Sequence, residues 1–423
     1  MKTKLKQTAT LTFGALLLSA CAGQPSIPKV EQAEVDKYEK AYMAEYEQIK
    51  QKNYKPSFKW VQPKNKKEEC KVWVSINPSD DKTTKSDYSL FWDGDCKDGY
   101  AYGLGREIEN TMLSNIRQIG YYQHGKAQDY CIQFDPLNGF TRDGECSYTP
   151  DKPNHYVKTF IKDKQGDLQI SYEFGVGISK NTPAMIMRTY PFYDVVEYFK
   201  IYPNFSYVIA DFTKNEFDTR KYEFNIKEHK NGKFNGFGFA TLKNGYTNAG
   251  EMQNGTLIRR VQLPQSYFNK ANSIFSEIKR EANLALEAQR KALIIKEKYK
   301  KKICKDSVQV DFMDNDEYKA ICHEDEYYAK LKQKIDYKLA QIEKQKQAKR
   351  TQQQQERLIR AREAEALAAQ RRAAAAEEAN SQRAWDSLNR SIQNTNTNMQ
   401  LQQLNNNIMM YNLTPKRYDV YLH

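Results

Sequence analysis

Seven cysteines are the residues of this sequence with the most reactive side chains, and their spacing limits their chemistry. Cys21 follows a short apolar run near the N-terminus, and the other six are spread over residues 70–322. None of them has the CxxC spacing that is typical of zinc or redox sites. We therefore predict no metal site among them.

The N-terminal segment has the layout of a signal peptide over residues 1–20. Three lysines lie within the first six residues, and an apolar run over 11–18 follows. That run is far shorter than the roughly 20 residues that span a bilayer. Leu18, Ser19, Ala20 and Cys21 then resemble the lipobox of the bacterial lipoprotein family. The resemblance implies cleavage before Cys21, diacylglycerol on its thiol and acylation of its amine.

The lipobox resemblance also implies a location for the mature chain. Several acyl chains on Cys21 anchor a protein stably, whereas a single chain does not. Ala22, rather than an aspartate, follows the cysteine, which implies delivery to the outer membrane of a Gram-negative cell. We expect a lipid-anchored protein there, at the periplasmic face in preference to the cell surface.

The remaining six cysteines are an even number in an exported chain, which favours disulfides. Sequence alone leaves many connectivities open. We favour the sequential one because each pair then falls inside its own local segment. The predicted pairs are Cys70–Cys96, Cys131–Cys146 and Cys304–Cys322.

Motifs of the common enzyme classes are absent from the sequence. There is no GxSxG elbow, phosphate loop, HExxH motif or Rossmann glycine fingerprint. The five histidines are scattered and are never four residues apart. An acidic cluster over 311–317 lacks the central glycine of a calcium loop, so we interpret it as a solvated loop. We therefore expect no enzyme, no cofactor and no metal.

Composition divides the chain into regions. All 19 glycines occur by residue 255, and no glycine or proline lies between 265 and 414. Residues 266–423 also carry most of the excess positive charge, with 29 Lys and Arg against 21 Asp and Glu. We predict an α+β protein with five parts. They are the signal peptide (1–20), the lipid anchor, linker and short helix (21–53), a β-rich domain (54–265), a helical arm (266–393) and a low-complexity, disordered tail (394–423).

Helical periodicity occurs on both sides of the β-rich domain. An apolar stripe over 30–52 predicts a short helix docked on that domain. A heptad-like stripe over 271–299, with Glu281 as its one polar member, predicts the first helix of the arm. A second stripe begins at Tyr328, and its helix is predicted to run from about residue 323 to 393. We expect these two helices to form an antiparallel hairpin, with the Cys304–Cys322 disulfide at its tip.

Glycine spacing in the β-rich domain repeats in two separated pieces. The GxxxGxG pattern of Gly232, Gly236 and Gly238 resembles the MORN repeat, and a similar pattern occurs near residue 100. The resemblance implies a twisted antiparallel sheet of hairpins that serves as a scaffold, and residues 154–227 must supply the missing strands. A short helix is predicted at 191–199. The repeat glycines are Gly94, Gly99, Gly103, Gly105, Gly232, Gly236, Gly238, Gly245, Gly250 and Gly255.

These features predict a non-enzymatic, lipid-anchored scaffold or protein-interaction lipoprotein of the cell envelope. Its partners would be the membrane, through acylated Cys21, and an envelope protein. The basic stretch 330–372 suits contact with peptidoglycan or another anionic surface. Export argues against nucleic acid. The alternative is an accessory lipoprotein of a secretion or pilus machine. A cell-wall hydrolase with an acid such as Asp95 or Glu107 ranks last, because nothing in the sequence places two carboxylates together.

Overall fold

The computed structural model of the chain describes residues 26–52, 57–76, 80–146, 153–164, 167–177, 182–304, 313 and 315–394. The signal peptide, Cys21 and the predicted disordered tail from residue 395 lie outside the described residues. The chain divides into two compact units, residues 1–339 and 340–423. Each unit is described by itself.

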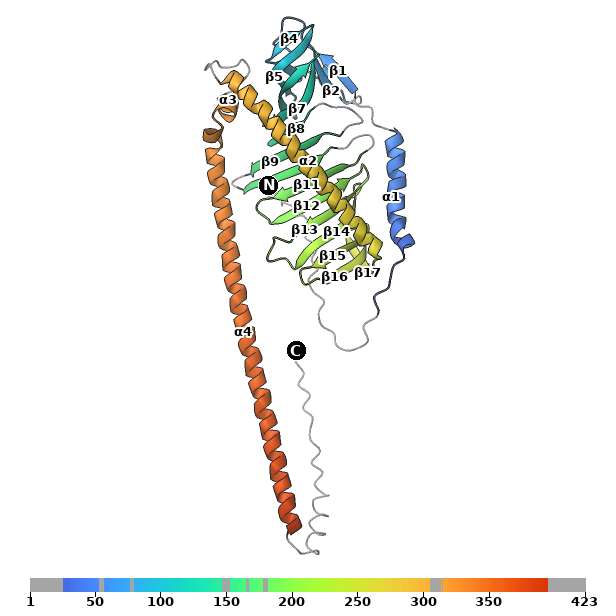
Figure 1. Cartoon of the computed structure of the whole chain (residues 1–423), viewed down its shortest axis with the longest axis vertical. Coiled ribbons are helices and arrows are strands. Elements are labelled where there is room, and N and C mark those ends of the chain that lie inside the picture. The colour runs from blue at the N-terminus through green and yellow to red at the C-terminus, as the bar shows by residue number, and fades with distance from the viewer. Residues whose placement is uncertain are drawn as a thin grey trace. The chain divides into compact units, whose positions relative to one another are not determined.

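A fifteen-stranded antiparallel sheet dominates the first unit (Figure 1). Almost every strand pairs with the next one along the chain, so the sheet is a succession of hairpins; β4 pairs only with β5. The strands are β3 (Ser89–Trp92), β4 (Asp95–Lys97), β5 (Tyr100–Asn110), β6 (Asn115–Gln123), β7 (Lys126–Asp135), β8 (Phe140–Glu145), β9 (His155–Lys164), β10 (Asp167–Val176), β11 (Ala184–Tyr190), β12 (Val195–Ile201), β13 (Phe205–Asp211), β14 (Arg220–Glu228), β15 (Gly236–Leu242), β16 (Thr247–Gln253) and β17 (Thr256–Arg260).

One face of this sheet is apolar along its length. Directly paired residues on successive strands form a continuous row across it, and most of them are aliphatic or aromatic. Side chains alternate between the faces of a strand, so the row shares one face. We call this the helix-covered face. The row is Ile119, Ile132, Asp143, Val157, Phe174, Met187, Tyr198, Ile209 and Phe224.

Two helices cover that apolar row (Figure 1). Helix α2 (Gln265–Ile303) crosses the strands from β6 to β12. Its stripe is buried, and Ile278 and Ala285 have no exposed surface. Helix α1 (Gln32–Lys52) packs its aromatic side chains on the later strands, as predicted, with the Tyr42 and Phe205 rings stacked 5.2 Å apart. The core of the first unit is therefore largely a helix-on-sheet layer.

The predicted hairpin of the arm is wrong in one respect. The stripe over 271–299 packs on the sheet and not on a partner helix. A heptad stripe shows only that one helix face is apolar, and the sheet offers the larger apolar surface. The predicted Cys304–Cys322 disulfide is present, and it links the end of α2 to α3 (Asn315–Cys322).

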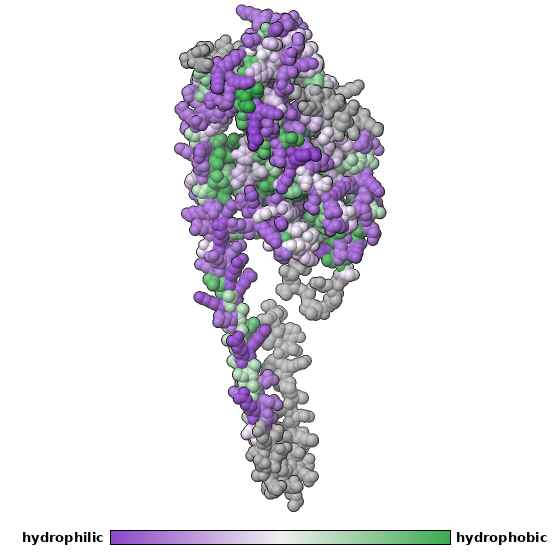
Figure 2. All heavy atoms as spheres, in the orientation of Figure 1, coloured by the Kyte–Doolittle hydropathy of each residue, from purple (hydrophilic) through white to green (hydrophobic). Residues whose placement is uncertain are grey.

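Helix α4 (Glu324–Asn394) confirms the predicted second helix, and its bounds differ from the predicted ones by one residue at each end. In the first unit, Lys334 pairs with Asp163 at 2.5 Å and Lys338 pairs with Asp167 at 2.9 Å. In the second unit, the described residues from 340 onward are mostly polar and exposed (Figure 2). Their few large apolar side chains, among them Leu358 and Trp385, are exposed as well.

Residues 191–199 are not the predicted short helix. They form a turn and then the strand β12. Val195 and Val196 are β-branched and favour a strand, and pairing with both neighbouring strands satisfies the backbone. The predicted strands within 154–227 are present, and they supply the missing part of the sheet.

Glu281, the polar member of the α2 stripe, has a defined partner on the sheet. Its Oε2 atom lies 2.8 Å from Nε2 of His155 on β9, and Nδ1 of the same imidazole lies 3.3 Å from Glu145 on β8. Arg280 also donates to Glu281 at 2.8 Å. The hydrogen bond to Glu145 raises the pKa of His155, the bond to Glu281 adds to the rise, and burial opposes both. Both ring nitrogens of His155 thus face carboxylates, one on the sheet and one on the helix, and a protonated imidazole can donate to both.

Docking of α2 through its apolar stripe predicts a large effect at a buried position. Ile278→Ala should lower the free energy of unfolding by about 2–5 kcal/mol, the cost of a buried cavity. Leu284→Ala, on the outer surface of the same helix, should change it by less than about 0.5 kcal/mol. Urea titration measures both. Equal effects at the two positions would contradict this docking.

The His155 contacts predict that stability depends on pH. Because the folded-state pKa is raised, the contribution is fully present below the unfolded pKa of about 6.5. It is lost as the pH rises through the higher folded pKa. The urea midpoint of the wild type should exceed that of His155→Gln at pH 5.5, and the difference should shrink above the folded pKa. A difference that grows with pH would exclude a protonated bridge.

Candidate functional site

The face opposite the helices carries a row of polar side chains. It begins on β5 at Glu107 and continues through directly paired residues to Glu197 on β12. We call this the polar face. No helix in the described part of the chain packs on it. Its row is Glu107, Gln118, Gln133, Arg142, Lys158, Glu173, Arg188 and Glu197.

Three cations lie close together in the middle of the polar face. Arg142 pairs directly with Lys158, and Arg188 lies two strands beyond Lys158. Each cation lies over an aromatic ring; the Lys158 ammonium is 4.0 Å from the centroid of Phe140 and 4.4 Å from that of Phe160. These three residues form what we call the cation cluster.

The charges of the cation cluster are only partly compensated. Arg188 donates to Glu173 at 2.9 Å from Nε. Arg142 and Lys158 have no carboxylate at ion-pair distance among the described residues. Burial lowers the pKa of Lys158, and Arg142 and Arg188 lower it further, against the opposite effect of Glu173. The cluster is therefore a place where an added anion would relieve repulsion.

A cavity of about 530 Å³ opens at the β5 end of the polar face. It lies between the sheet and a separate two-stranded sheet, β1 (Ser57–Val61) and β2 (Val72–Ile76). Carboxyl, amide, hydroxyl, ammonium and aromatic groups line it together. The lining residues are Phe58, Trp73, Val74, Ser75, Lys82, Glu107, Glu109, Ile116, Gln118, Lys126, Ala127, Gln128, Gln133 and Cys146.

Two carboxyl groups of the cavity come from one strand. Glu107 and Glu109 are two residues apart on β5, so both point to the polar face. The Tyr122 hydroxyl donates to Glu107 at 2.5 Å, and Gln118 donates to that hydroxyl at 2.7 Å. Burial raises the pKa of Glu107 to about 7, and the charge of Glu109 contributes in the same direction. Glu109 pairs with Lys82 at 2.6 Å.

The structure therefore brings together two carboxyl groups that nothing in the sequence analysis had placed together. Glu107 was a candidate acid and Glu109 was missed, although alternation along a strand over 100–110 would have placed both on one face. Asp95, the other candidate acid, lies on β4 and is not among the cavity-lining residues.

The aromatic wall of the cavity belongs to the two-stranded sheet. Phe58 stacks on Trp73, with ring centroids 5.2 Å apart and planes inclined by 12°. The Lys126 ammonium lies 4.8 Å from the centroid of Trp73. These contacts give the wall a fixed apolar surface next to the polar row.

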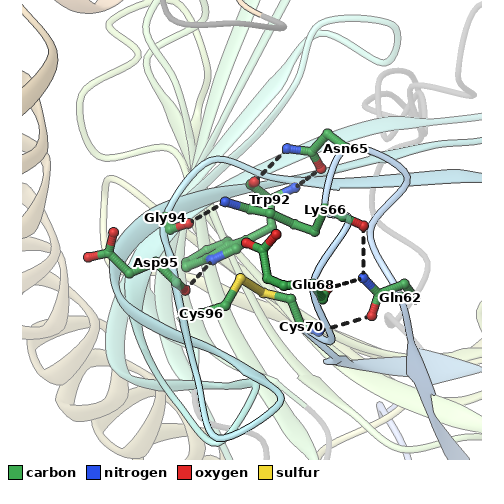
Figure 3. Close-up of a disulfide and its surroundings, with 9 residues drawn as sticks. All are labelled: Gln62, Asn65, Lys66, Glu68, Cys70, Trp92, Gly94, Asp95 and Cys96. Carbon is green, nitrogen blue, oxygen red and sulfur yellow. Dashed lines mark hydrogen bonds between the residues drawn. A yellow bond between two sulfur atoms is a disulfide. The ribbon is translucent and has the colours of Figure 1, made fainter.

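The predicted Cys70–Cys96 disulfide is present and joins the start of β2 to β4 (Figure 3). Asn65 makes two hydrogen bonds to the backbone of Trp92, at 2.7 and 3.0 Å (Figure 3). A Cβ atom on Gly94 would lie 2.3 Å from the Trp92 ring, and one on Gly105 would lie 2.5 Å from it. The buried indole thus requires glycine at both repeat positions.

The other repeat glycines fall into two groups. Gly238 and Gly250 pair directly on the polar face, beside a smaller hollow of about 30 Å³. The remaining six have positive φ angles, as expected where a chain turns tightly. They are Gly99, Gly103, Gly232, Gly236, Gly245 and Gly255.

The predicted Cys131–Cys146 disulfide is absent, and both residues are free thiols. Cys131 pairs directly with Gly144, so Cys146 is offset from it by two residues. These diagonal neighbours lie on the same face of the sheet and their thiols interact with each other, although no disulfide joins them. The Cys146 thiol instead donates to the carbonyl of Gln128 at 3.3 Å.

The described residues contain no cluster of three or more His, Cys, Asp or Glu side chains arranged to hold a metal ion. Among the helices that the structure describes, none is both long and apolar enough to cross a membrane.

No protein-family model matches the chain, and no curated protein matches it.

The cysteine geometry predicts the outcome of peptide mapping. Alkylation of the unreduced, denatured protein should label Cys131 and Cys146, and mapping should recover Cys70–Cys96 and Cys304–Cys322 as linked peptides. Mass spectrometry of the digest measures both. A linked Cys131–Cys146 peptide in freshly isolated protein would show that this pair is oxidised in the native chain.

Proposed function

We propose that the protein is a non-enzymatic, lipid-anchored scaffold of the bacterial envelope that binds an acidic segment of another envelope protein on its polar face. The signal-peptide layout and the lipobox resemblance at Cys21 support the anchor. The succession of hairpins and its glycine positions support a MORN-like scaffold. The observation that carries the binding role is the cation cluster of Arg142, Lys158 and Arg188.

The chemistry of the proposed partner segment follows from the charges of the cation cluster. Arg142 and Lys158 are neighbours with no carboxylate at ion-pair distance in the described part of the chain, although Glu173 pairs with Lys158 across the strands. Burial makes the repulsion between the two cations stronger than in water. Carboxylates of a partner would pair with both cations. Aromatic rings beneath the cations hold them in place and offer apolar contact. An acidic segment that also carries apolar side chains fits this surface.

The proposal is tested by photo-crosslinking in live cells. A photoreactive amino acid at Lys162, an exposed position on the polar face of β9, should crosslink to an acidic segment of an envelope protein. Arg142→Glu in the same chain should reduce that crosslink at least tenfold, because charge reversal replaces attraction by repulsion. Immunoblotting measures the yield, and mass spectrometry identifies the crosslinked peptide.

As a control, the photoreactive amino acid at position 284, on the outer surface of α2, should give no crosslink to that acidic segment. Cys21→Ser should remove the protein from the outer-membrane fraction and abolish the crosslink. Crosslinks to lipopolysaccharide, to a segment without acidic residues, or with a yield unchanged by Arg142→Glu would overturn the binding role. Unchanged membrane fractionation of Cys21→Ser would overturn the anchor.

A further inference from the structure

The cavity beneath β1 and β2 is not explained by binding at the cation cluster. Its volume of about 530 Å³ falls within the range of about 300–1,000 Å³ that small-molecule pockets span. Two polar side chains of its lining have no hydrogen-bond partner in the described part of the chain. The Gln133 amide and the Ser75 hydroxyl have no hydrogen bond among the described residues, although both line the cavity.

The formal charges of the lining balance. Two carboxyl groups, Glu107 and Glu109, face two ammonium groups, Lys82 and Lys126. Glu109 and Lys82 neutralise each other directly at 2.6 Å. Lys126 lies against the indole of Trp73. A strongly anionic ligand such as a phosphate would therefore lack a cationic cluster here, and a cationic ligand would lack a free carboxylate pair.

The neutral groups define the ligand chemistry. Amides from Gln118, Gln128 and Gln133 offer both donors and acceptors, as ring hydroxyls require. Phe58 and Trp73 form an apolar wall opposite these amides. A pyranose has this same division, because its hydroxyls lie at the ring edge and its C–H groups form an apolar surface.

We propose that the cavity between the two-stranded sheet and the polar face binds a short, uncharged oligosaccharide. The Gln133 amide and the Ser75 hydroxyl bind ring hydroxyls, and Phe58 and Trp73 pack against the ring. The Cys70–Cys96 disulfide holds the wall in position before the ligand arrives, so little ordering accompanies binding. This site is independent of the partner proposed for the cation cluster.

Glu107 makes the site sensitive to pH. Below its pKa of about 7 the carboxyl is protonated and donates a hydrogen bond, while Oε2 accepts from Tyr122. Above that pH the ionised group only accepts, and its charge is buried near Glu109 and only partly offset by Lys82. Lys126, Cys146, Tyr122 and Tyr88 are the other titratable groups around Glu107. Oligosaccharide affinity should fall as the pH rises through 7.

The test is calorimetric titration of the full mature lipoprotein in detergent with three uncharged probes. These are the tetramers of N-acetylglucosamine, of β-1,4-linked glucose and of α-1,4-linked glucose. The wild type should bind at least one probe, and Gln133→Leu should lower the affinity for that probe at least tenfold. Gln169→Leu, the same substitution at an exposed position on β10, is the matched control and should leave affinity unchanged. Ser75→Trp, at an exposed strand position, should block the cavity without disturbing the main sheet.

Two further outcomes decide the proposal. Glu107→Gln should keep its affinity from pH 6 to pH 8.5, whereas the wild type should lose affinity over that interval, because the amide remains a donor. The proposal is overturned if no probe binds the wild type, or if both Gln133→Leu and Ser75→Trp bind as tightly as the wild type. The crosslink at position 162 tests only the binding role of the cation cluster, and calorimetry tests only the cavity. One proposal can therefore be wrong while the other holds.

Discussion

The structure depends on covering one apolar face of a very long sheet. An antiparallel sheet of fifteen strands exposes a continuous row of aliphatic and aromatic side chains, which is unstable in water unless another layer buries it. Helix α2 supplies that layer across seven strands, and small residues such as Ala285 and Ala292 allow the helix to approach closely. Both helices lie on this face, which leaves the opposite face for polar side chains.

The polar face follows from the same alternation along each strand. Successive side chains of a strand point to opposite faces, so Glu107, Gln133 and Lys158 lie opposite the apolar row, in a row of directly paired polar residues. At one end the two-stranded sheet lies over this face, and a cavity opens between the two sheets. Farther along, the face holds a cluster of cations on aromatic rings. One sheet thus presents two chemically different surfaces to ligands.

Local pattern was enough to predict α1, α2, α4, the β-rich domain and the strands within 154–227, but not the short helix α3. It did not predict the partner of the α2 stripe, because periodicity shows that Ile278 is buried but not what buries it. The 191–199 segment was misread because its apolar spacing fits a helix, whereas cross-strand pairing decides its conformation. The cavity depends on register: Gln118, Gln133 and Glu107 meet only after three strands align, and no local signal encodes that alignment. The Cys131–Cys146 pairing was predicted from sequence proximity, which does not show whether two neighbouring thiols are oxidised.

The chain enters the first unit beside the last strand of the sheet. Val30 donates to the carbonyl of Gln262 at 3.0 Å and Gln262 donates to that of Pro28 at 2.8 Å, so residues 28–30 run parallel to the segment that follows β17. The short parallel pairing thus fixes the start of the described chain to the connection between β17 and α2. It also sets a mechanical path: tension applied upstream of residue 26 loads these two hydrogen bonds and the packing of α1 before it loads the strands of the polar face.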